Sequence, residues 1–426
     1  MKQILVVLLI LLIMLSAETG FSQTTTGPAA AKASPAERSV AQANKLIEKN
    51  PKNFEAYNAL ALALSRRARE TSDVSYYTQA ESALQKSFEI SPNNFDGERT
   101  HVWLLLGKHE FAAALDEAKK LNKRTPDDVM TYGFLTDANV ELGNYKDAEI
   151  GAQWMLDLRP GNLPGLTRAA YLRELFGDIE GASELMNMAF QSTPPSEAED
   201  AAWILTQMAH LKLEVGNTEE AEKLLGRALT MFPGYHYALG NLAKVRILEK
   251  RYDEAIQLLE QRYQAAPHAE NLYEVAEALE LAGRFDEAKN AFAKFVQKSL
   301  VETNRADNSN RELIFYYADY AHEPAKALEV AKKESVRRHD VYTLDSYAWA
   351  LYSNGQYDEA RKQMQMALEP GIQDAKLFFH AGEIALKNGD RVDAEHYLQL
   401  SANLNALGSD EARVALANLT QTAIPH

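Results

Sequence analysis

The sequence predicts an all-α solenoid, a stack of about ten helical hairpins with one further helix at each end. The chain has 426 residues, and helix-favouring Ala, Leu, Glu and Lys dominate it, while strand-like runs of alternating Val, Ile and Thr are nearly absent. An alanine recurs about every 34 residues, and a period of roughly 20 to 50 residues is typical of a repeat architecture. The ten alanines are Ala80, Ala114, Ala148, Ala182, Ala221, Ala255, Ala288, Ala327, Ala360 and Ala394.

The N-terminal residues 1–22 are predicted to be an export signal. A lysine at the second position precedes an unbroken apolar run over residues 4–15, which is too short to cross a bilayer as a helix. Small residues favour cleavage after Ser22. Cleavage elsewhere, for example after Ala17, and retention of the segment as an anchor both stay open. Residues 23–34 are small and polar, so we predict a flexible linker there.

Two amphipathic segments flank the repeats and are predicted to be capping helices. The first lies within residues 35–50, and the second lies within residues 405–426, where it is followed by a short tail. The apolar residues on their predicted faces are Val40, Ala43, Leu46, Ile47, Val414, Leu416 and Leu419. Such helices hide the core that the first and last hairpins of a solenoid would otherwise expose.

The spacing around Ala148 illustrates the predicted hairpin. An apolar helical pattern ends at Gly143, which can take the left-handed conformation that closes a helix. A second amphipathic helix follows and stops before Pro160. Because the two helices approach most closely at Ala148, the residue there must be small. Each hairpin buries its remaining apolar surface on its neighbours.

These motifs resemble the tetratricopeptide repeat. The turns Gly283-Arg-Phe285-Asp-Glu-Ala288 and Gly355-Gln-Tyr357-Asp-Glu-Ala360 are similar to that family's Gly-x-Tyr-x-x-Ala turn, and the first repeat carries Tyr57, Leu60, Ala61 and Leu64 at the offsets of its first helix. The resemblance covers about residues 53–404 and implies a right-handed superhelical solenoid. It divides the chain into repeats 1–4 over residues 51–195, repeats 5–7 over residues 196–300 and repeats 8–10 over residues 301–404.

Four departures from the period are predicted to have local consequences. Extra residues fall near 70–75, 194–197 and 300–308, where we expect longer surface loops. The eighth repeat lacks the glycine turn and has Pro324 where the aromatic residue belongs. We expect the array to bend or loosen there.

Composition and motifs argue against several classes of function. The net charge of −15 disfavours nucleic acid as a partner, because phosphate binding requires a basic face. The chain has no cysteine, so disulfides, thiolate metal sites and a lipid-modified cysteine are excluded. No HExxH unit, phosphate loop or nucleophile elbow occurs. We therefore expect no enzyme, no cofactor and no metal site.

The resemblance implies that the first helix of each repeat lines a concave groove. Carried over residue by residue, the family's ligand-contacting places give an aromatic and acidic lining, in which only Lys244 is basic among the middle repeats. The predicted groove residues are Tyr171, Trp203, Tyr237, Tyr273, Glu277, Glu280, Tyr316, Asp319, Tyr342, Asp345, Trp349, Tyr352 and Phe379. Some of these rings could instead pack between neighbouring first helices. The near absence of bases disfavours capture of a terminal carboxylate.

Together these features predict a non-catalytic protein-binding scaffold of the cell envelope, exported and periplasmic or otherwise extracytoplasmic. An aromatic and acidic groove suits protein or peptide segments with basic or apolar side chains. Two alternatives stay open. Aromatic rings also stack on sugars, so the chain could bind glycans during polysaccharide assembly or export. A regulatory module of an enzyme complex is the third hypothesis. The sequence does not define the oligomeric state.

Overall fold

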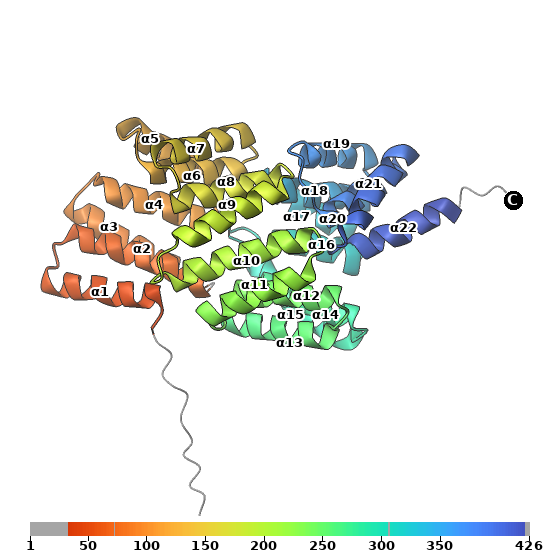
Figure 1. Cartoon of the computed structure of the whole chain (residues 1–426), viewed down its shortest axis with the longest axis horizontal. Coiled ribbons are helices and arrows are strands. Elements are labelled where there is room, and N and C mark those ends of the chain that lie inside the picture. Colours follow the sequence, from red (N-terminus) through yellow and green to blue (C-terminus); the bar gives the residue numbers. More distant parts are fainter. Residues whose placement is uncertain (1–32, 72, 306, 422–426) are drawn as a thin grey trace, which may run out of the picture. The chain divides into compact units, whose positions relative to one another are not determined.

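A computed structural model describes residues 33–71, 73–305 and 307–421 of the chain. The description below concerns the compact unit that begins at Pro35. The predicted export signal and nearly all of the predicted linker lie outside the described residues. Within those residues the structure has 22 α-helices, one short π-helix and no strand (Figure 1).

Ten consecutive helical hairpins make up most of this unit, which confirms the all-α solenoid. Their first helices, in order, are α2 (Phe54–Thr71), α4 (Phe95–Gly107), α6 (Val129–Glu141), α8 (Leu163–Leu175), α10 (Ala198–Glu214), α12 (His236–Leu248), α14 (Ala269–Leu281), α16 (Asn310–Phe315), α18 (Val341–Ser353) and α20 (Ala375–Lys387). Their second helices are α3 (Ser75–Ile90), α5 (Phe111–Arg124), α7 (Tyr145–Leu158), α9 (Ile179–Ser192), α11 (Thr218–Met231), α13 (Tyr252–Ala265), α15 (Phe285–Glu302), α17 (Pro324–Glu334), α19 (Tyr357–Leu368) and α21 (Arg391–Leu404). Helices α1 (Pro35–Lys49) and α22 (Ser409–Gln421) flank them.

The ten periodic alanines lie where the two helices of each hairpin meet, and all ten are completely buried. A larger side chain there would push the helices apart, because protein interiors are close-packed. Between the two helices of hairpin 3, Gly143 has φ +74° and its N–H donates to the carbonyl of Val140 at 3.0 Å. This left-handed turn closes α6 and turns the chain into α7.

Hairpin 8 is closed by a different turn. Its first helix α16 continues into the π-helix η1 (Tyr316–Tyr320), where the N–H of Ala321 donates to the carbonyl of Tyr316 at 2.9 Å. His322 then takes a left-handed conformation with φ +52°, and Pro324 opens α17. The π-turn thus replaces the missing glycine turn while Ala327 keeps its buried place.

Two of the three segments with extra residues contain the loops expected from the sequence: residues 193–197 connect α9 to α10, and the chain between Glu302 and Asn310 connects α15 to α16. Some of the extra residues also lengthen helices, since α2 continues to Thr71, α15 continues to Glu302 and α10 has 17 residues. Periodicity counts extra residues but does not show whether they continue a helix. The consequence is that lengthened helices reach other hairpins.

The lengthened α2 and α10 bind each other across four hairpins of sequence. Arg66 of α2 pairs with Glu197 at 2.6 Å, and Arg69 pairs with Asp200 at 2.7 Å. Arg69 also pairs with Glu199, which accepts a hydrogen bond from the buried Tyr235 hydroxyl at 2.8 Å. Ion pairs therefore link hairpin 1 to hairpin 5, and the Tyr235 hydrogen bond extends this contact to the start of hairpin 6.

A longer line of contacts, here called the seam, joins early hairpins to late ones. One side consists of the turns between the two helices of hairpins 2 to 6. The other side consists of the connections that follow hairpins 7 to 10 and the start of α22. The five contacting pairs along it, in order, are His109 with Asp307, Gly143 with His339, Gly177 with Gly371, Gly216 with Leu404, and Lys250 with Asp410.

Apolar and polar contacts both hold the seam. One hydrophobic cluster contains Val140 and Leu175 of hairpins 3 and 4 together with Val341 and Leu344 of hairpin 9. The backbone N–H of His339 donates to the carbonyl of Glu141 at 2.9 Å. Accordingly, α17 and α18 lie beside α7 and α8 in Figure 1. The seam brings the first helices of hairpins 5 to 10 around a common interior.

Candidate functional site

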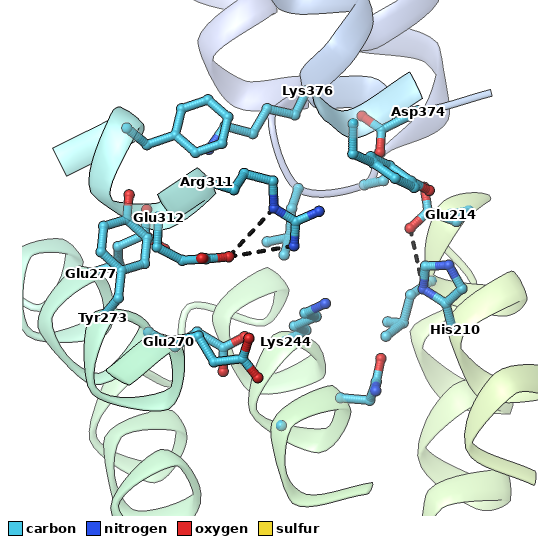
Figure 2. A pocket seen from close by; sticks show the side chains of 18 of the residues that line it. His210, Glu214, Lys244, Glu270, Tyr273, Glu277, Arg311, Glu312, Asp374 and Lys376 are labelled. Atoms are coloured by element: carbon cyan, nitrogen blue, oxygen red, sulfur yellow. Dashed lines mark hydrogen bonds and ion pairs between the residues drawn. The ribbon is translucent and has the colours of Figure 1, made fainter. Parts of the chain in front are cut away.

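The first helices of hairpins 5 to 10 surround a cavity of 490 Å³, here called the charged cavity (Figure 2). Its walls come from α10, α12, α14, α16, α18 and α20, together with one side chain of α13 and the connection before α22. Charged groups of both signs face it. The acids are Glu214, Glu270, Glu274, Glu277, Glu312, Asp345 and Asp374. The bases are His210, Lys244, Arg262, Arg311 and Lys376.

Arg262 reaches this cavity from a second helix, where residues normally face away from it. Its guanidinium passes over Gly240 of α12, and a Cβ atom there would lie 2.9 Å from Nη1 of Arg262. Inside, Arg262 pairs with Glu274 and lies 4.0 Å from Glu270. Burial alone would raise the pKa of Glu274, but the charge of Arg262 outweighs it and the pKa is lowered. Because Gly240 has no side chain, the guanidinium of Arg262 can pass over α12 and enter the cavity.

His210 forms the centre of a buried ionic triad. Its Nε2 lies 3.0 Å from Glu174 and its Nδ1 lies 3.5 Å from Glu214. Burial favours the neutral imidazole, but the two carboxylates outweigh burial and raise the pKa of His210 to about 9. Burial raises the pKa of Glu214 to about 7 despite the attraction of His210. His210 is therefore a cation at neutral pH.

A second cavity of 420 Å³, here called the aromatic cavity, adjoins the first and shares Gly240, Lys244, Glu277 and Lys376 with it. Trp349 forms one wall, and its indole N–H donates to the Asp319 carboxylate at 2.7 Å. The rings of Trp349 and Tyr352 are stacked, with centroids 4.6 Å apart. Phe379 and the half-exposed Leu281 complete an apolar surface, which is bordered by four acids and by Lys244 and Lys376.

The structure brings most of the predicted groove residues to three cavities. Tyr237, Tyr273, Glu277, Tyr342 and Asp345 line the charged cavity. Glu277, Asp319, Trp349 and Phe379 line the aromatic cavity. Tyr171 and Trp203 line a separate cavity of 550 Å³ beside Arg69 and Arg168. Glu280, Tyr316 and Tyr352 line none of the three.

Several predicted groove rings serve mainly as packing residues. Tyr273 and Trp349 are 4% and 8% exposed, and Tyr316 packs against Phe292 with centroids 5.3 Å apart. Asp345 is 6% exposed and pairs with His380 at 2.8 Å. The first helices are therefore too closely packed for every inward position to contact a ligand.

Sequence reasoning missed the cavity's other bases. Arg262 lies on a second helix, Arg311 lies in the first turn of α16, and Lys376 lies in the first turn of α20. Among the lysines and arginines of the cavity, only Lys244 was placed inside from the repeat pattern. Gly240 was the available signal for Arg262, because a glycine within a helix indicates close approach by another group.

Two further searches of the described residues concern metals and membranes. No group of three or more His, Asp or Glu side chains in residues 33–71, 73–305 and 307–421 is placed to hold a metal ion. None of the helices in those ranges is long and apolar enough to span a bilayer.

Comparisons with known proteins identify the repeat. Two family models described as tetratricopeptide repeat match residues 43–73 and 212–268. The mouse protein DnaJ homolog subfamily C member 3 is 24% identical over 260 residues, covering 56% of this chain and 51% of the relative. The match thus spans about half the length of that relative.

Two solved structures that are similar to this chain have low sequence identity to it. A structure of human IFIT1 dimer with m7Gppp-AAAA is 16% identical, covers 87% of this chain and 86% of its own, and has a TM-score of 0.49. The APC/C hetero-tetramer Cut9-Hcn1 is 14% identical, covers 89% and 58%, and has a TM-score of 0.46. The two matched segments and the ten hairpins together support a tetratricopeptide-repeat protein.

Proposed function

We propose that this chain is a non-catalytic scaffold that binds segments of partner proteins along the aromatic cavity. The single observation that carries the proposal is the apolar surface of Leu281, Trp349 and Phe379 bordered by Glu277 and Asp319. Leu281 is 51% exposed, so an apolar side chain that water now contacts is available to a partner.

The acidic border defines the chemistry of the partner. Four acids, Glu277 and Asp319 among them, outnumber the two lysines of this cavity. They favour a segment whose basic side chains flank an apolar one, since aromatic walls attract both cations and apolar groups. The same acids disfavour nucleic acid. We place this activity in the cell envelope because of the predicted export signal, which lies outside the described residues.

The test compares two leucines of similar exposure. Leu281→Glu puts a charge beside the aromatic cavity, whereas Leu300→Glu puts the same charge on α15 at a leucine that is 54% exposed and does not line it. Wild type and both variants are used as baits in an envelope extract, and recovered protein and polysaccharide are both quantified.

The proposal predicts recovery of specific proteins that Leu281→Glu abolishes and Leu300→Glu leaves unchanged. Equal recovery by all three baits would contradict binding at the aromatic cavity. Recovery of polysaccharide in place of protein would favour the glycan-binding alternative. Circular dichroism of each bait establishes that the helices are intact.

A further inference from the structure

The charged cavity contains ions that its own ion pairs do not compensate. Arg262 pairs with Glu274, and Arg311 lies 3.4 Å from Glu312. His210 lies 3.5 Å from Glu214, and His380 lies 2.8 Å from Asp345. The ionic groups that remain, apart from Glu270 at 4.0 Å from Arg262, are Lys244, Lys376, Glu277 and Asp374.

The two lysines form no ion pair within the described part of the chain. Lys376 lies over the ring of Phe315, with its Nζ 4.3 Å from the centroid, so a cation–π contact orients it. Lys244 extends from α12 into the cavity (Figure 2). Both ammonium groups are therefore open to an anionic group of a ligand.

The two carboxylates have hydrogen bonds but no ion pair. Glu277 accepts a hydrogen bond from the Tyr320 hydroxyl at 3.3 Å, and Asp374 accepts one from the backbone N–H of Leu377 at 2.8 Å. Burial raises the pKa of both carboxyls. A nearby cation would offset that burial cost, and neither carboxylate has one within ion-pair distance in the described chain.

Within the described chain, the cavity therefore has two lysines and two carboxylates without an ion pair around one volume. A volume of 490 Å³ falls within the range of roughly 300 to 1,000 Å³ that is usual for small-ligand sites. None of the four lies within ion-pair distance of an opposite charge among the described residues, and the charge of Lys376 offsets only part of the effect of burial on the pKa of Glu277 and Asp374. A simple anion or a simple cation would compensate only half of them.

We propose that the charged cavity binds a small zwitterion, with the chemistry of a short peptide that has free termini. Its ammonium group pairs with Glu277, and its carboxylate pairs with Lys244. Asp374 lies on the opposite side of the cavity from Glu277 (Figure 2). The hydroxyl of Tyr273, a residue that is 4% exposed, is a further donor beside Glu277. The site shares Lys244, Glu277 and Lys376 with the aromatic cavity, but its dependence on free peptide termini is tested separately from the Leu281 comparison above.

The test uses equilibrium dialysis of the full chain against pools of random tripeptides, read out by mass spectrometry. Three pools are compared: peptides with free termini, the same peptides N-acetylated, and the same peptides C-amidated. The structure predicts retention of the free pool and at least about tenfold less retention of each blocked pool, because each block removes one charge-assisted contact.

Matched variants connect retention to the cavity. Lys244→Gln and Glu277→Gln keep hydrogen-bonding ability and lose the charge, and each is expected to lower retention at least about tenfold. Lys289→Gln removes an exposed lysine of α15 and should change nothing. Thermal unfolding of each variant identifies any loss that comes from misfolding, and Glu277→Gln keeps the acceptor for Tyr320.

Three results would overturn the proposal. The first is no retention of the free pool, which would mean that water alone occupies the cavity. The second is equal retention of free and blocked pools. The third is retention that survives C-amidation but not N-acetylation, which would make the cavity a site for cations.

Discussion

The turn glycines of the early hairpins and those of the late hairpins have the same backbone and different neighbours. Gly143, Gly177 and Gly216 have φ of +74°, +79° and +69°, and Gly283 and Gly355 have φ of +73° and +75°. At the first three, a Cβ atom would meet the backbone of a hairpin far along the chain, whereas at the other two it would meet nothing within 4 Å. A glycine that closes a turn therefore also contacts a distant part of the chain where it lies along the seam.

This difference indicates where the array is held together beyond nearest neighbours. In a solenoid whose hairpins touch only adjacent hairpins, stability is approximately the sum of each hairpin's own stability and the contacts with its nearest neighbours. Here hairpins 2 to 6 also contact the connections after hairpins 7 to 10. The same substitution at equivalent turns should therefore lower the free energy of unfolding by different amounts.

The largest expected effect is the difference between Gly177→Ala and Gly283→Ala. Both substitutions place alanine in a left-handed conformation, which costs about 1 kcal/mol. At Gly177 the new Cβ also overlaps the carbonyl oxygen of Gly371, and overpacking adds about 2 kcal/mol. Urea unfolding followed by circular dichroism should show about 3 kcal/mol lost for Gly177→Ala and about 1 for Gly283→Ala. Equal losses would mean that the seam contact at Gly177 contributes no stability.

A smaller effect is expected from Arg338→Met compared with Arg284→Met. Arg338 pairs with Glu141 across the seam, and the two side chains are 26% and 23% exposed. Removing this partly buried partner should cost about 2 kcal/mol, between the values for surface and buried pairs. Arg284 pairs with Glu287 on the surface, beside the turn at Gly283 that lies outside the seam. Removing Arg284 should therefore lower the free energy of unfolding by about 0.5 kcal/mol. Similar costs for the two variants, measured by the same unfolding assay, would contradict the seam's role.

The smallest effect concerns pH at the first position of the seam. Burial and the charge of Arg338 lower the pKa of His109 to about 4. A histidine whose folded pKa is depressed contributes stability that is present above pH 6.5 and lost as pH falls through 4. His109→Asn, which tolerates the φ of +60° at this position, should flatten the fall in melting temperature between pH 6.5 and 4. An unchanged slope would show that this histidine does not titrate with unfolding.

The sequence was sufficient to predict the hairpins because each depends on short-range geometry. Ala148 has to be small where two helices meet, and Gly143 has to tolerate positive φ, so both constraints recur at the repeat period. Helices also cover the segments predicted to cap the array. The seam could not be predicted in this way, because Gly177 and Gly283 are required by the same turn whether or not another hairpin lies against it.

The candidate site was predicted only in part for a related reason. Inward positions such as Tyr237 and Tyr342 follow from the period of the first helices, and they do line the charged cavity. Arg262 does not follow from it, since that side chain enters from a second helix over Gly240. Whether an inward ring contacts a ligand or packs, as Tyr316 packs on Phe292, depends on how closely adjacent helices approach.

The central claim, that the early turns contact the late connections, is tested most directly by cross-linking. The natural chain has no cysteine, so a bismaleimide can react only with introduced ones. His109→Cys with Asp307→Cys places a pair where the native side chains lie 3.7 Å apart. The control combines Asp307→Cys with Gly283→Cys, which lies at a turn outside the seam. The seam predicts an intramolecular link in the first double variant and none in the second. No link in the first, or links only between separate molecules, would contradict it.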